Sequence, residues 1–143
     1  MPILEFTIEG PPFSINQQGK GPKQTKNKRL WHERVRNAAL AALPDGYAII
    51  NVNTFVHIAY YYDINRRDID NIVKPILDAL GEKSLDDRHY HAIVWNDDNM
   101  VNRLLVELYH RPTVVVENPS ALIASALDQF SEIVYVRIEW EAA

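Results

Sequence analysis

The stretch INVNTFVHIAYYYDINRRDIDNIVKPILDAL, residues 50 to 80, changes its hydrophobic period halfway along. Up to Tyr60, apolar residues alternate with polar ones, which is typical of a β-strand with one buried face. From about residue 71 onward they recur at helical spacing, and Gly81 can close such a helix in the left-handed conformation. A charged segment, residues 66 to 74, joins the two. The stretch therefore predicts a strand, a charged connection and a helix.

Three other segments alternate apolar and polar residues in the same way, so each can cover one side of a core. Their apolar faces consist of Leu4, Phe6 and Ile8; of Leu104, Val106 and Leu108; and of Val134, Val136, Ile138 and Trp140. Helical spacing recurs from about Lys28 to Leu43 and from Pro119 to Phe130, where Asn118 can cap the helix. This order predicts an α/β domain of the α+β type, with one mixed sheet of about four strands and two or three packed helices.

Length and composition indicate one domain over residues 1–143, because nearly half of the residues are apolar and can form a core. The lack of cysteine in the sequence excludes disulfides and thiolate metal sites, and it fits a cytoplasmic protein. No secretory signal pattern starts the chain, and polar residues interrupt the longest uncharged run, from Gly46 to Tyr62. We therefore expect no contact with a membrane.

Charge is distributed unevenly in this acidic chain of net charge −4. Between Lys20 and Arg36, seven basic residues accompany the single acid Glu33. We expect a basic loop or arm at about residues 17–30 that holds a DNA backbone, although an ordinary solvated loop would have the same composition. The predicted DNA-binding residues are Lys20, Lys23, Lys26, Lys28, Arg29, Arg66 and Arg67.

The segment RRDIDNIVK, residues 66 to 74, contains the strongest candidates for chemistry. If it is extended, Asp68 and Asp70 point to the same side and Ile69 points away to pack. Two carboxylates on one side suit Mg²⁺, which prefers hard oxygen ligands. Lys74 follows Asp70 by one helical turn and can reduce the repulsion between the acids or stabilise charge on a phosphate. The alternative is structural: a helix cap followed by a surface ladder of Asp70, Lys74 and Asp78.

A second acidic element, VWNDDNMV at residues 94 to 101, carries Asp97 and Asp98 between apolar residues. Such flanks are unusual for a plain turn. Another pair, Asp86 and Asp87, lies in the preceding segment, but it is followed by the polar run Arg-His-Tyr. The apolar flanks favour the pair Asp97 and Asp98 over this one.

The pattern R-R-D-x-D-N-x-x-K, followed by D-A-L, a D-D pair and a valine, resembles the signature of RusA-type Holliday junction resolvases. The opening PPFSIN at residues 11–16 is similar to the P-P-x-S-x-N opening of that family. The resemblance implies that Asp68, Asp70 and Asp98 are the essential acids and the metal ligands. It also implies that Lys74 is the catalytic lysine and that Asp97 is an accessory ligand.

The same resemblance implies a cofactor and partners. The cofactor would be Mg²⁺, with Mn²⁺ as a possible substitute. The enzyme would be a homodimer that resolves four-way DNA junctions in recombination and repair, each subunit cutting one strand so that ligatable nicks remain. A two-fold symmetric protein matches a two-fold symmetric junction.

Some features depart from the family pattern, and other functions therefore stay open. Sixteen residues, Gly81 to Asn96, separate D-A-L from the D-D pair, and the helix expected near residues 119–130 is an addition. One alternative is Mg²⁺-dependent cleavage of other branched or duplex nucleic acid, including flaps and RNA. A second is a non-catalytic DNA-binding module of the same fold. A glycosyltransferase D-x-D site is disfavoured, because the chain has no glycine-rich nucleotide-binding loop.

Two further groups of residues have competing explanations. His89 and His91 would share one face of a strand, but no third zinc ligand of that type is near them in the sequence. Trp31, Trp95 and the run from Tyr60 to Tyr62 could stack on unpaired bases. We favour a place in the core for these aromatic residues.

Overall fold

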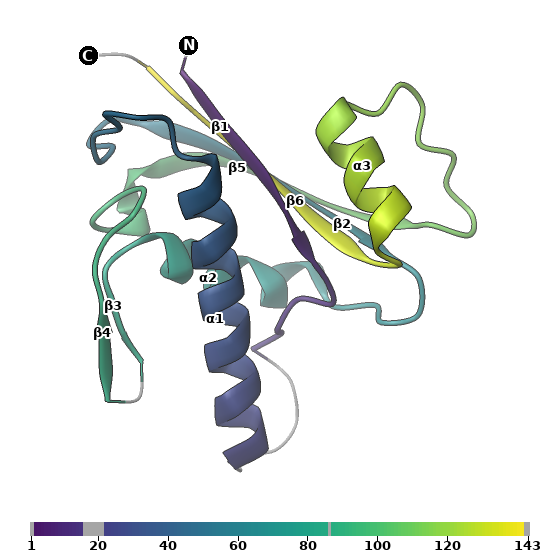
Figure 1. Cartoon of the computed structure of the whole chain (residues 1–143), viewed down its shortest axis with the longest axis horizontal. Helices are drawn as coiled ribbons and strands as arrows, with labels where there is room; N and C mark the ends of the chain where they lie inside the picture. The colour runs from purple at the N-terminus through teal and green to yellow at the C-terminus, as the bar shows by residue number, and fades with distance from the viewer. Residues whose placement is uncertain (1, 16–21, 86, 142–143) are drawn as a thin grey trace.

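Figure 1 shows the computed structural model, which describes residues 2–15, 22–85 and 87–141. In chain order the elements are β1 (Ile3–Glu9), α1 (Pro22–Ala42), β2 (Thr54–Tyr62), α2 (Ile69–Leu80), β3 (Lys83–Leu85), β4 (Arg88–Tyr90), the 3₁₀ turn η1 (Asp98–Met100), β5 (Val101–His110), α3 (Ala121–Gln129) and β6 (Ile133–Trp140). The predicted α+β class with a four-stranded mixed sheet is confirmed.

The four long strands form the sheet in the order β1-β6-β2-β5. Strand β6 runs antiparallel to β1 and β2, whereas β5 runs parallel to β2. The register aligns one row of residues across the sheet, namely Phe6, Val136, Ile58 and Val106. Because side chains alternate between the two faces, this register places the apolar faces of all four strands on the same side.

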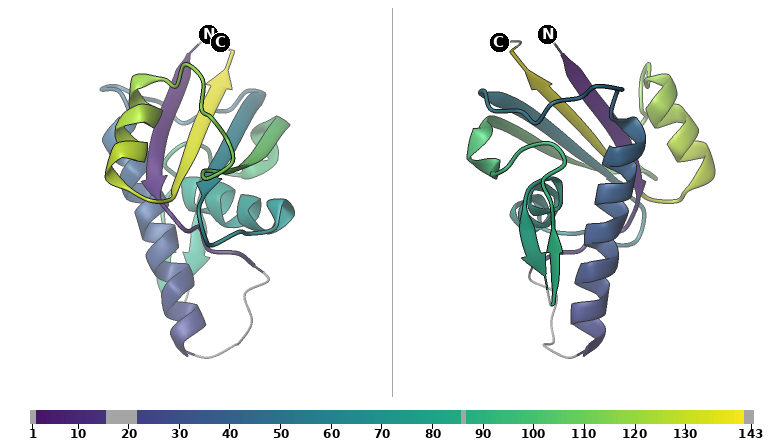
Figure 2. Two further views of the ribbon diagram at one scale, coloured as in Figure 1. Left: turned by 90° about the vertical axis from the view of Figure 1, so that its right-hand side faces the viewer. Right: turned by 60° about the vertical axis from the view of Figure 1, so that its left-hand side comes forward.

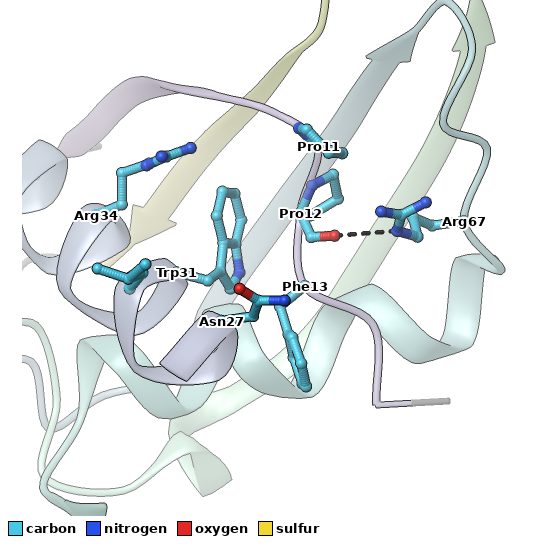
Figure 3. A pocket seen from close by; sticks show the side chains of 8 residues that line it. Pro11, Pro12, Phe13, Asn27, Trp31, Arg34 and Arg67 are labelled. Atoms are coloured by element: carbon cyan, nitrogen blue, oxygen red, sulfur yellow. Dashed lines mark hydrogen bonds between the residues drawn. The ribbon is translucent and has the colours of Figure 1, made fainter. Parts of the chain in front are cut away.

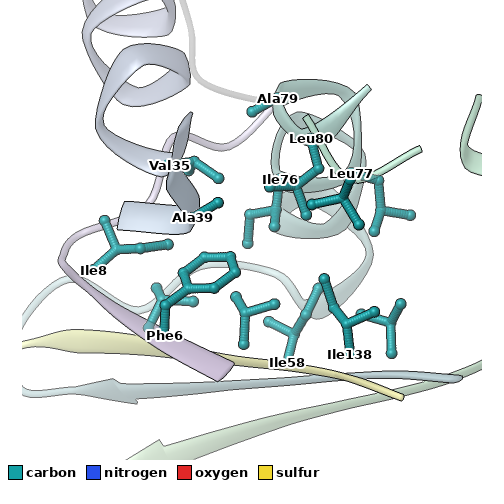
Figure 4. Packing of buried hydrophobic residues seen from close by; sticks show 14 of the residues in the cluster. Phe6, Ile8, Val35, Ala39, Ile58, Ile76, Leu77, Ala79, Leu80 and Ile138 are labelled. Atoms are coloured by element: carbon teal, nitrogen blue, oxygen red, sulfur yellow. The ribbon is translucent and has the colours of Figure 1, made fainter. Parts of the chain in front are cut away.

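That side of the sheet is covered by α1 and α2, and α3 covers part of the other side (Figures 1 and 2). Figure 4 shows the main core, where Phe6, Ile58 and Ile138 of the sheet meet Val35 of α1 and Ile76 of α2. Burying one such aliphatic side chain contributes about 1.5–3 kcal/mol. The core therefore fixes both helices against the sheet, and with them the connection that precedes α2.

The aromatic residues considered for base stacking belong mostly to the core. Trp95 and Tyr60 have no exposed surface, and Trp31 is 4% exposed. Tyr61 is also buried, whereas Tyr62 is half-buried. The core interpretation is confirmed for the four buried residues.

Helix α1 begins earlier than predicted. The prediction of a basic loop is therefore wrong for residues 22–30, which are helical. The helix starts at Pro22, a residue whose fixed φ suits the first helical position, and the polar residues that follow are adequate helix formers. Four predicted DNA-binding residues are therefore helical: Lys23, Lys26, Lys28 and Arg29. Lys20 lies outside the described residues.

Neither α1 nor any other helix in the described ranges has the length and apolar character needed to cross a membrane.

Two helix ends differ from their prediction. Gly81 ends α2 with an extended backbone (φ −109°), not a left-handed one. A Cβ atom there would lie 3.1 Å from Cδ1 of Trp95, so close approach rather than backbone torsion requires glycine. At α3 the cap is Ser120, whose hydroxyl accepts a hydrogen bond from the N–H of Ile123 at 3.3 Å. Asn118, the predicted cap, instead has a positive φ of 48° in the preceding turn.

Strand β5 is an edge strand, and its apolar face is less covered than its sequence period predicts. Leu104 is 45% exposed, while Val106 and Leu108 are half-buried against the core. The long segment before the second acidic pair contains the hairpin β3–β4, which we did not predict. Its strands have three residues each, too few for a period to be recognised.

Candidate active site

The connection from β2 to α2 is held in place by Glu132, which lies just before β6. Its buried carboxylate accepts hydrogen bonds from the backbone N–H groups of Asp63, Ile64 and Asn65 at 2.8, 3.0 and 2.9 Å. The side chain of Asn65 adds a fourth, at 2.9 Å. Burial acts to raise the pKa of Glu132, but these hydrogen bonds hold it below its ordinary value. An ionised carboxylate therefore fixes the loop that leads into the RRDID segment.

Asp68 is the N-cap residue of α2, and Asp70 lies in its first turn. Asp68 has the predicted extended backbone (φ −70°, ψ 136°), but Asp70 does not, because the helix begins at Ile69, which is 43% exposed rather than packed. The alternation of an extended segment, which would point both carboxylates to one side, therefore does not hold from Asp68 to Asp70. The side chain of Asp68 lies 3.6 Å from Arg66 on the exposed surface. The Asp70 carboxylate makes no hydrogen bond or ion pair within the described residues.

A short strap, residues 11–15, runs past the start of α2. Pro75 lies within α2 and has no N–H, so the carbonyl of Asn71 receives no hydrogen bond from the next helical turn. The N–H of Ile15 donates to that carbonyl instead, at 3.1 Å. Pro75 thus creates the place where the strap is attached to the helix.

Lys74 joins the two acidic elements of the sequence. Its Nζ lies 2.6 Å from Oδ2 of Asp98 and 3.0 Å from Oδ1 of Asp78. Hydrogen bonds to Asp98 and Asp78 raise the pKa of Lys74 to about 12, so it is a cation at neutral pH. The second carboxylate oxygen of Asp78 lies 3.4 Å from Nζ of Lys83. The surface ladder considered above therefore includes Lys74 and Asp78 but not Asp70.

A cavity of about 160 Å³ opens around this ion pair, and we call it the acidic cavity. Its charged lining residues are Lys74, Asp78, Glu82, Lys83, Asp97 and Asp98. Asp97 also caps η1, because its Oδ1 accepts a hydrogen bond from the N–H of Asn99 at 2.9 Å. Carboxylates gathered in this way favour a cation among them, and the ammonium group of Lys74 is one.

The structure brings Lys74, Asp97 and Asp98 together and places Asp68 and Asp70 at the start of the helix that carries Lys74. Over residues 2–15, 22–85 and 87–141, no three acids or histidines are grouped closely enough to hold a metal ion. The predicted metal ligands thus fall into two groups, Asp68 and Asp70 at the start of α2 and Asp97 and Asp98 at η1, which Lys74 connects without a closed ligand set among the described residues.

The competing acidic pair and the histidine pair both lie on or beside the hairpin. Asp87 is exposed in its turn, and Asp86 lies outside the described residues. His89 and His91 pack ring against ring with centroids 5.1 Å apart, and Glu82 lies 3.9 Å from His89. Of the two later acidic pairs, the one containing Asp98 contacts Lys74 of the motif. The two histidines have no third ligand within the described residues.

The predicted DNA-binding cations differ in their surroundings. Lys26 and Lys28 are exposed on the first turns of α1, and the side chain of Arg66 is 62% exposed. Arg67 is more constrained, because its Nε donates to the carbonyl of Pro12 in the strap at 3.2 Å. Exposed cations beside the acids are positioned to meet a phosphate backbone.

Two acids with evident roles were not recognised in the sequence. Asp78 was assigned only to a surface ladder, although its spacing of four residues from Lys74 was the available signal. Glu132 gave no local signal, because it binds backbone N–H groups that are distant in the sequence.

A helix start carrying carboxylates, a lysine that reaches a second acidic element and an exposed arginine nearby are typical of a phosphodiesterase that acts on a polyanion. A sequence model of the family described as Endodeoxyribonuclease RusA matches residues 13–118. The chain belongs to the RusA endodeoxyribonuclease family, whose members resolve Holliday junctions. Nucleases of this family are generally metal-dependent, and the family implies a branched DNA substrate. Among curated proteins, none matches the sequence.

Proposed function

We propose that the protein hydrolyses one phosphodiester bond in each of two opposed strands of a four-way junction, with Asp68, Asp70 and Asp98 holding a divalent cation. The 2.6 Å contact between Lys74 Nζ and Asp98 Oδ2 carries this proposal, because it joins the D-x-D-N-x-x-K motif to an acid 24 residues further on. The expected ion is Mg²⁺, with Mn²⁺ as a substitute. When bound, the ion supplies an activated water and stabilises the leaving oxygen. The cysteine-free composition favours action in the cytoplasm.

The donor chemistry of these residues fits a hard cation. The Asp70 carboxylate has no partner within the described part of the chain. Asp68 has only an exposed ion pair with an arginine, a contact that contributes little. Asp98 already has a cation as its partner, at Lys74. Asp97 is only an accessory ligand, because one of its two carboxylate oxygens already accepts the hydrogen bond that caps η1.

The remaining residues bind and position the substrate. Lys74 holds Asp98 and presents positive charge beside the acids, where negative charge develops on the phosphate. The proposed contacts to the DNA backbone come from Lys20, Lys23, Lys26, Lys28, Arg29, Arg66 and Arg67.

A symmetric homodimer would deliver the two cuts to a two-fold symmetric junction. Strand β5 supports this proposal, because it is an edge of the sheet where Leu104 and Leu105 are 45% and 43% exposed. Light scattering of the purified protein should give twice the chain mass of 16.5 kDa. The Leu104→Glu variant should shift the mass toward that of one chain.

The test is cleavage of a synthetic four-way junction with each strand labelled in turn. In Mg²⁺ we expect paired, ligatable nicks, and Asp70→Asn should lose cleavage while junction binding persists. Asp45→Asn, an exposed aspartate after α1, is the matched control and should cut at the rate of the parent protein. Junctions left intact by the folded dimer in both Mg²⁺ and Mn²⁺ would overturn the proposal. Flaps, nicked duplex and RNA belong in the same panel, since they test the preference for junctions.

A further inference from the structure

A second cavity, of about 260 Å³, lies between the strap and α1, beside the residue that precedes Asp68 (Figure 3). It is lined by Pro11, Pro12, Phe13, Asn27, Leu30, Trp31, Arg34 and Arg67. We propose that this aromatic cavity takes up one unpaired nucleobase from the branch point, next to the strand that is cut. The proposal rests on the proposed function, because it takes branched DNA as the substrate.

The cavity is built on fixed walls. The N–H of Gly10, just before the strap, donates to the carbonyl of Glu132 at 2.8 Å. At the far end of the strap, the N–H of Ile15 donates to the carbonyl of Asn71 at 3.1 Å. Glu132 orders the loop before α2, and Asn71 lies in the first turns of that helix. The aromatic cavity and the proposed catalytic acids are therefore attached to one frame.

Shape and surface suit a flat aromatic ring. Phe13 contributes a ring surface, Pro11 and Pro12 add apolar contacts, and the buried Trp31 closes the wall behind them. Stacking of a base on such side chains is sequence-tolerant, since every base has a π-face. At about 260 Å³ the cavity is smaller than the roughly 300–1,000 Å³ of sites for drug-sized ligands, which suits a single base.

Trp31 supplies a hydrogen-bond donor that the protein does not use. The residue is 4% exposed, and its Nε1 is buried without a hydrogen-bond partner among the residues that the structure describes. A buried N–H left in that state is costly, so an acceptor on a ligand is favoured here. Asn27, one helical turn earlier, adds an amide with both donor and acceptor groups. Ring nitrogens and carbonyl oxygens on base edges provide the complementary groups.

Charge also favours a nucleotide. Two guanidinium groups, of Arg34 and Arg67, line the aromatic cavity, and no acid among the described residues does, although the chain as a whole is acidic. Arg34 donates one N–H to the carbonyl of Glu9 at 3.3 Å, and Arg67 donates to the carbonyls of Pro12 at 3.2 Å and of Arg66 at 3.5 Å. A guanidinium has five N–H donors, so others can reach the phosphates that flank a captured base.

Only an unpaired base can enter a cavity of this size. Taking a base out of a duplex costs stacking and pairing energy, and that cost is least for a base that is already unpaired. At a branch point the continuous stack of the duplex is interrupted, which lowers the cost of taking a base out. Capture next to Asp68 would make binding depend on the base at one position, and it would select where the strand is cut.

The experiment measures what one base contributes to binding. Four-way junctions receive a single abasic site at each branch-point position in turn, and their affinity is measured without divalent cations so that no strand is cut. At one position we expect the abasic site to weaken binding about tenfold, which corresponds to the loss of one stacked base. Phe13→Ala and Asn27→Ala should each reduce that penalty, and the second variant changes a half-exposed residue and so spares the core. Asn37→Ala, an exposed amide on the same helix, should keep the full penalty.

Equal abasic penalties in the parent protein and in both cavity variants, at every position, would overturn the proposal. A parent protein that cuts junctions without this base dependence would refute the aromatic cavity alone. A parent protein that shows the base dependence but cuts no junction would support the cavity and overturn the proposed function.

Discussion

The acidic cavity and the aromatic cavity lie near the same helix but have opposite chemistry. Among the described residues, the first is lined by four acids with Lys74 and Lys83, and the second by two arginines and ring surfaces without an acid. Helix α2 contributes Lys74 to the first, and through the carbonyl of Asn71 it anchors the strap that forms the second. The arginines of the aromatic cavity attract a polyanionic DNA strand. At the acidic cavity the same strand needs a bound cation to offset the charge of the acids.

This difference explains how a chain of net charge −4 can act on DNA. Total charge averages over groups that hold a cation and groups that hold phosphate, so it predicts neither site. The two sites are separated by a buried layer that includes Trp31 and His32, which lines a small void together with Asp78 and Lys83. Substitutions can therefore be chosen that change one cavity alone, or only the buried layer between the two cavities.

The largest effect is expected at Asp98. Asp98→Asn should lower junction cleavage by about 10³-fold or more, because it removes a charged ligand and leaves Lys74 without its closest partner. Asp87→Asn makes the same change in the competing acidic pair, at an exposed position, and should leave the rate unchanged. Single-turnover rates in Mg²⁺ decide between them. The reverse order of effects would move the site to the hairpin.

Protonation of His32, in the buried layer between the two cavities, should reduce the free energy of unfolding. Burial, assisted by Arg36, lowers the pKa of His32 from 6.5 to about 4. The folded protein therefore binds this proton more weakly than the unfolded chain, so stability is complete above pH 6.5 and falls as the pH decreases toward 4. The loss reaches about 3 kcal/mol. The groups that face the ring are Glu33 and Arg36 on α1, Asp78 on α2, Lys83 on β3 and Tyr90 on β4.

Urea unfolding between pH 7.5 and 4 measures this dependence. His32→Gln should flatten the curve of unfolding free energy against pH over that range. The same substitution at the exposed His91 should leave the slope as it is in the parent protein. A slope that His32→Gln does not change would assign the acid sensitivity to other groups.

Lys74 should affect the chemical step more than binding. Lys74→Gln removes the cation between Asp78 and Asp98, and we expect cleavage to fall about 10²-fold with junction affinity nearly unchanged. Lys83→Gln is the comparison, because Lys83 also pairs with Asp78 but has no contact with Asp98. Its effect should be under about fivefold, as for an exposed ion pair. Equal losses of cleavage rate for both variants would mean that the acidic cavity needs positive charge, but not a cation in contact with Asp98.

The sheet was predictable where a strand has one covered face. Phe6, Ile58 and Val136 repeat with period two, and each is buried on the predicted side. The order of the strands was not predictable, because β1 pairs with β6 at the opposite end of the chain and no local pattern records that contact. Leu104 fits the same period but is 45% exposed, since an edge strand lies beyond the covering helices.

The candidate site was predictable to the extent that chemistry is local in sequence. The spacing of Asp70 and Lys74 was visible, and family resemblance singled out Asp98 among the later acids. The start of α2 at Ile69 was missed, because a cap and an extended residue have the same local sequence signals. Glu132 and the aromatic cavity depend on contacts between distant segments, the strap with α1 and the loop before α2 with β6.

The smallest effect is expected on the phosphate-binding side of the comparison, at Arg67. Arg67→Gln should weaken junction binding about tenfold at low salt and lower the slope of log affinity against log salt by about one, as expected for one lost phosphate contact. Arg137→Gln provides the control, because Arg137 lies on the sheet face opposite the main core, paired with Glu139 at 2.6 Å. Titrations at several salt concentrations measure both slopes. If the two variants have the same slope, the DNA does not contact the aromatic cavity at Arg67, and both arginines act only through total charge.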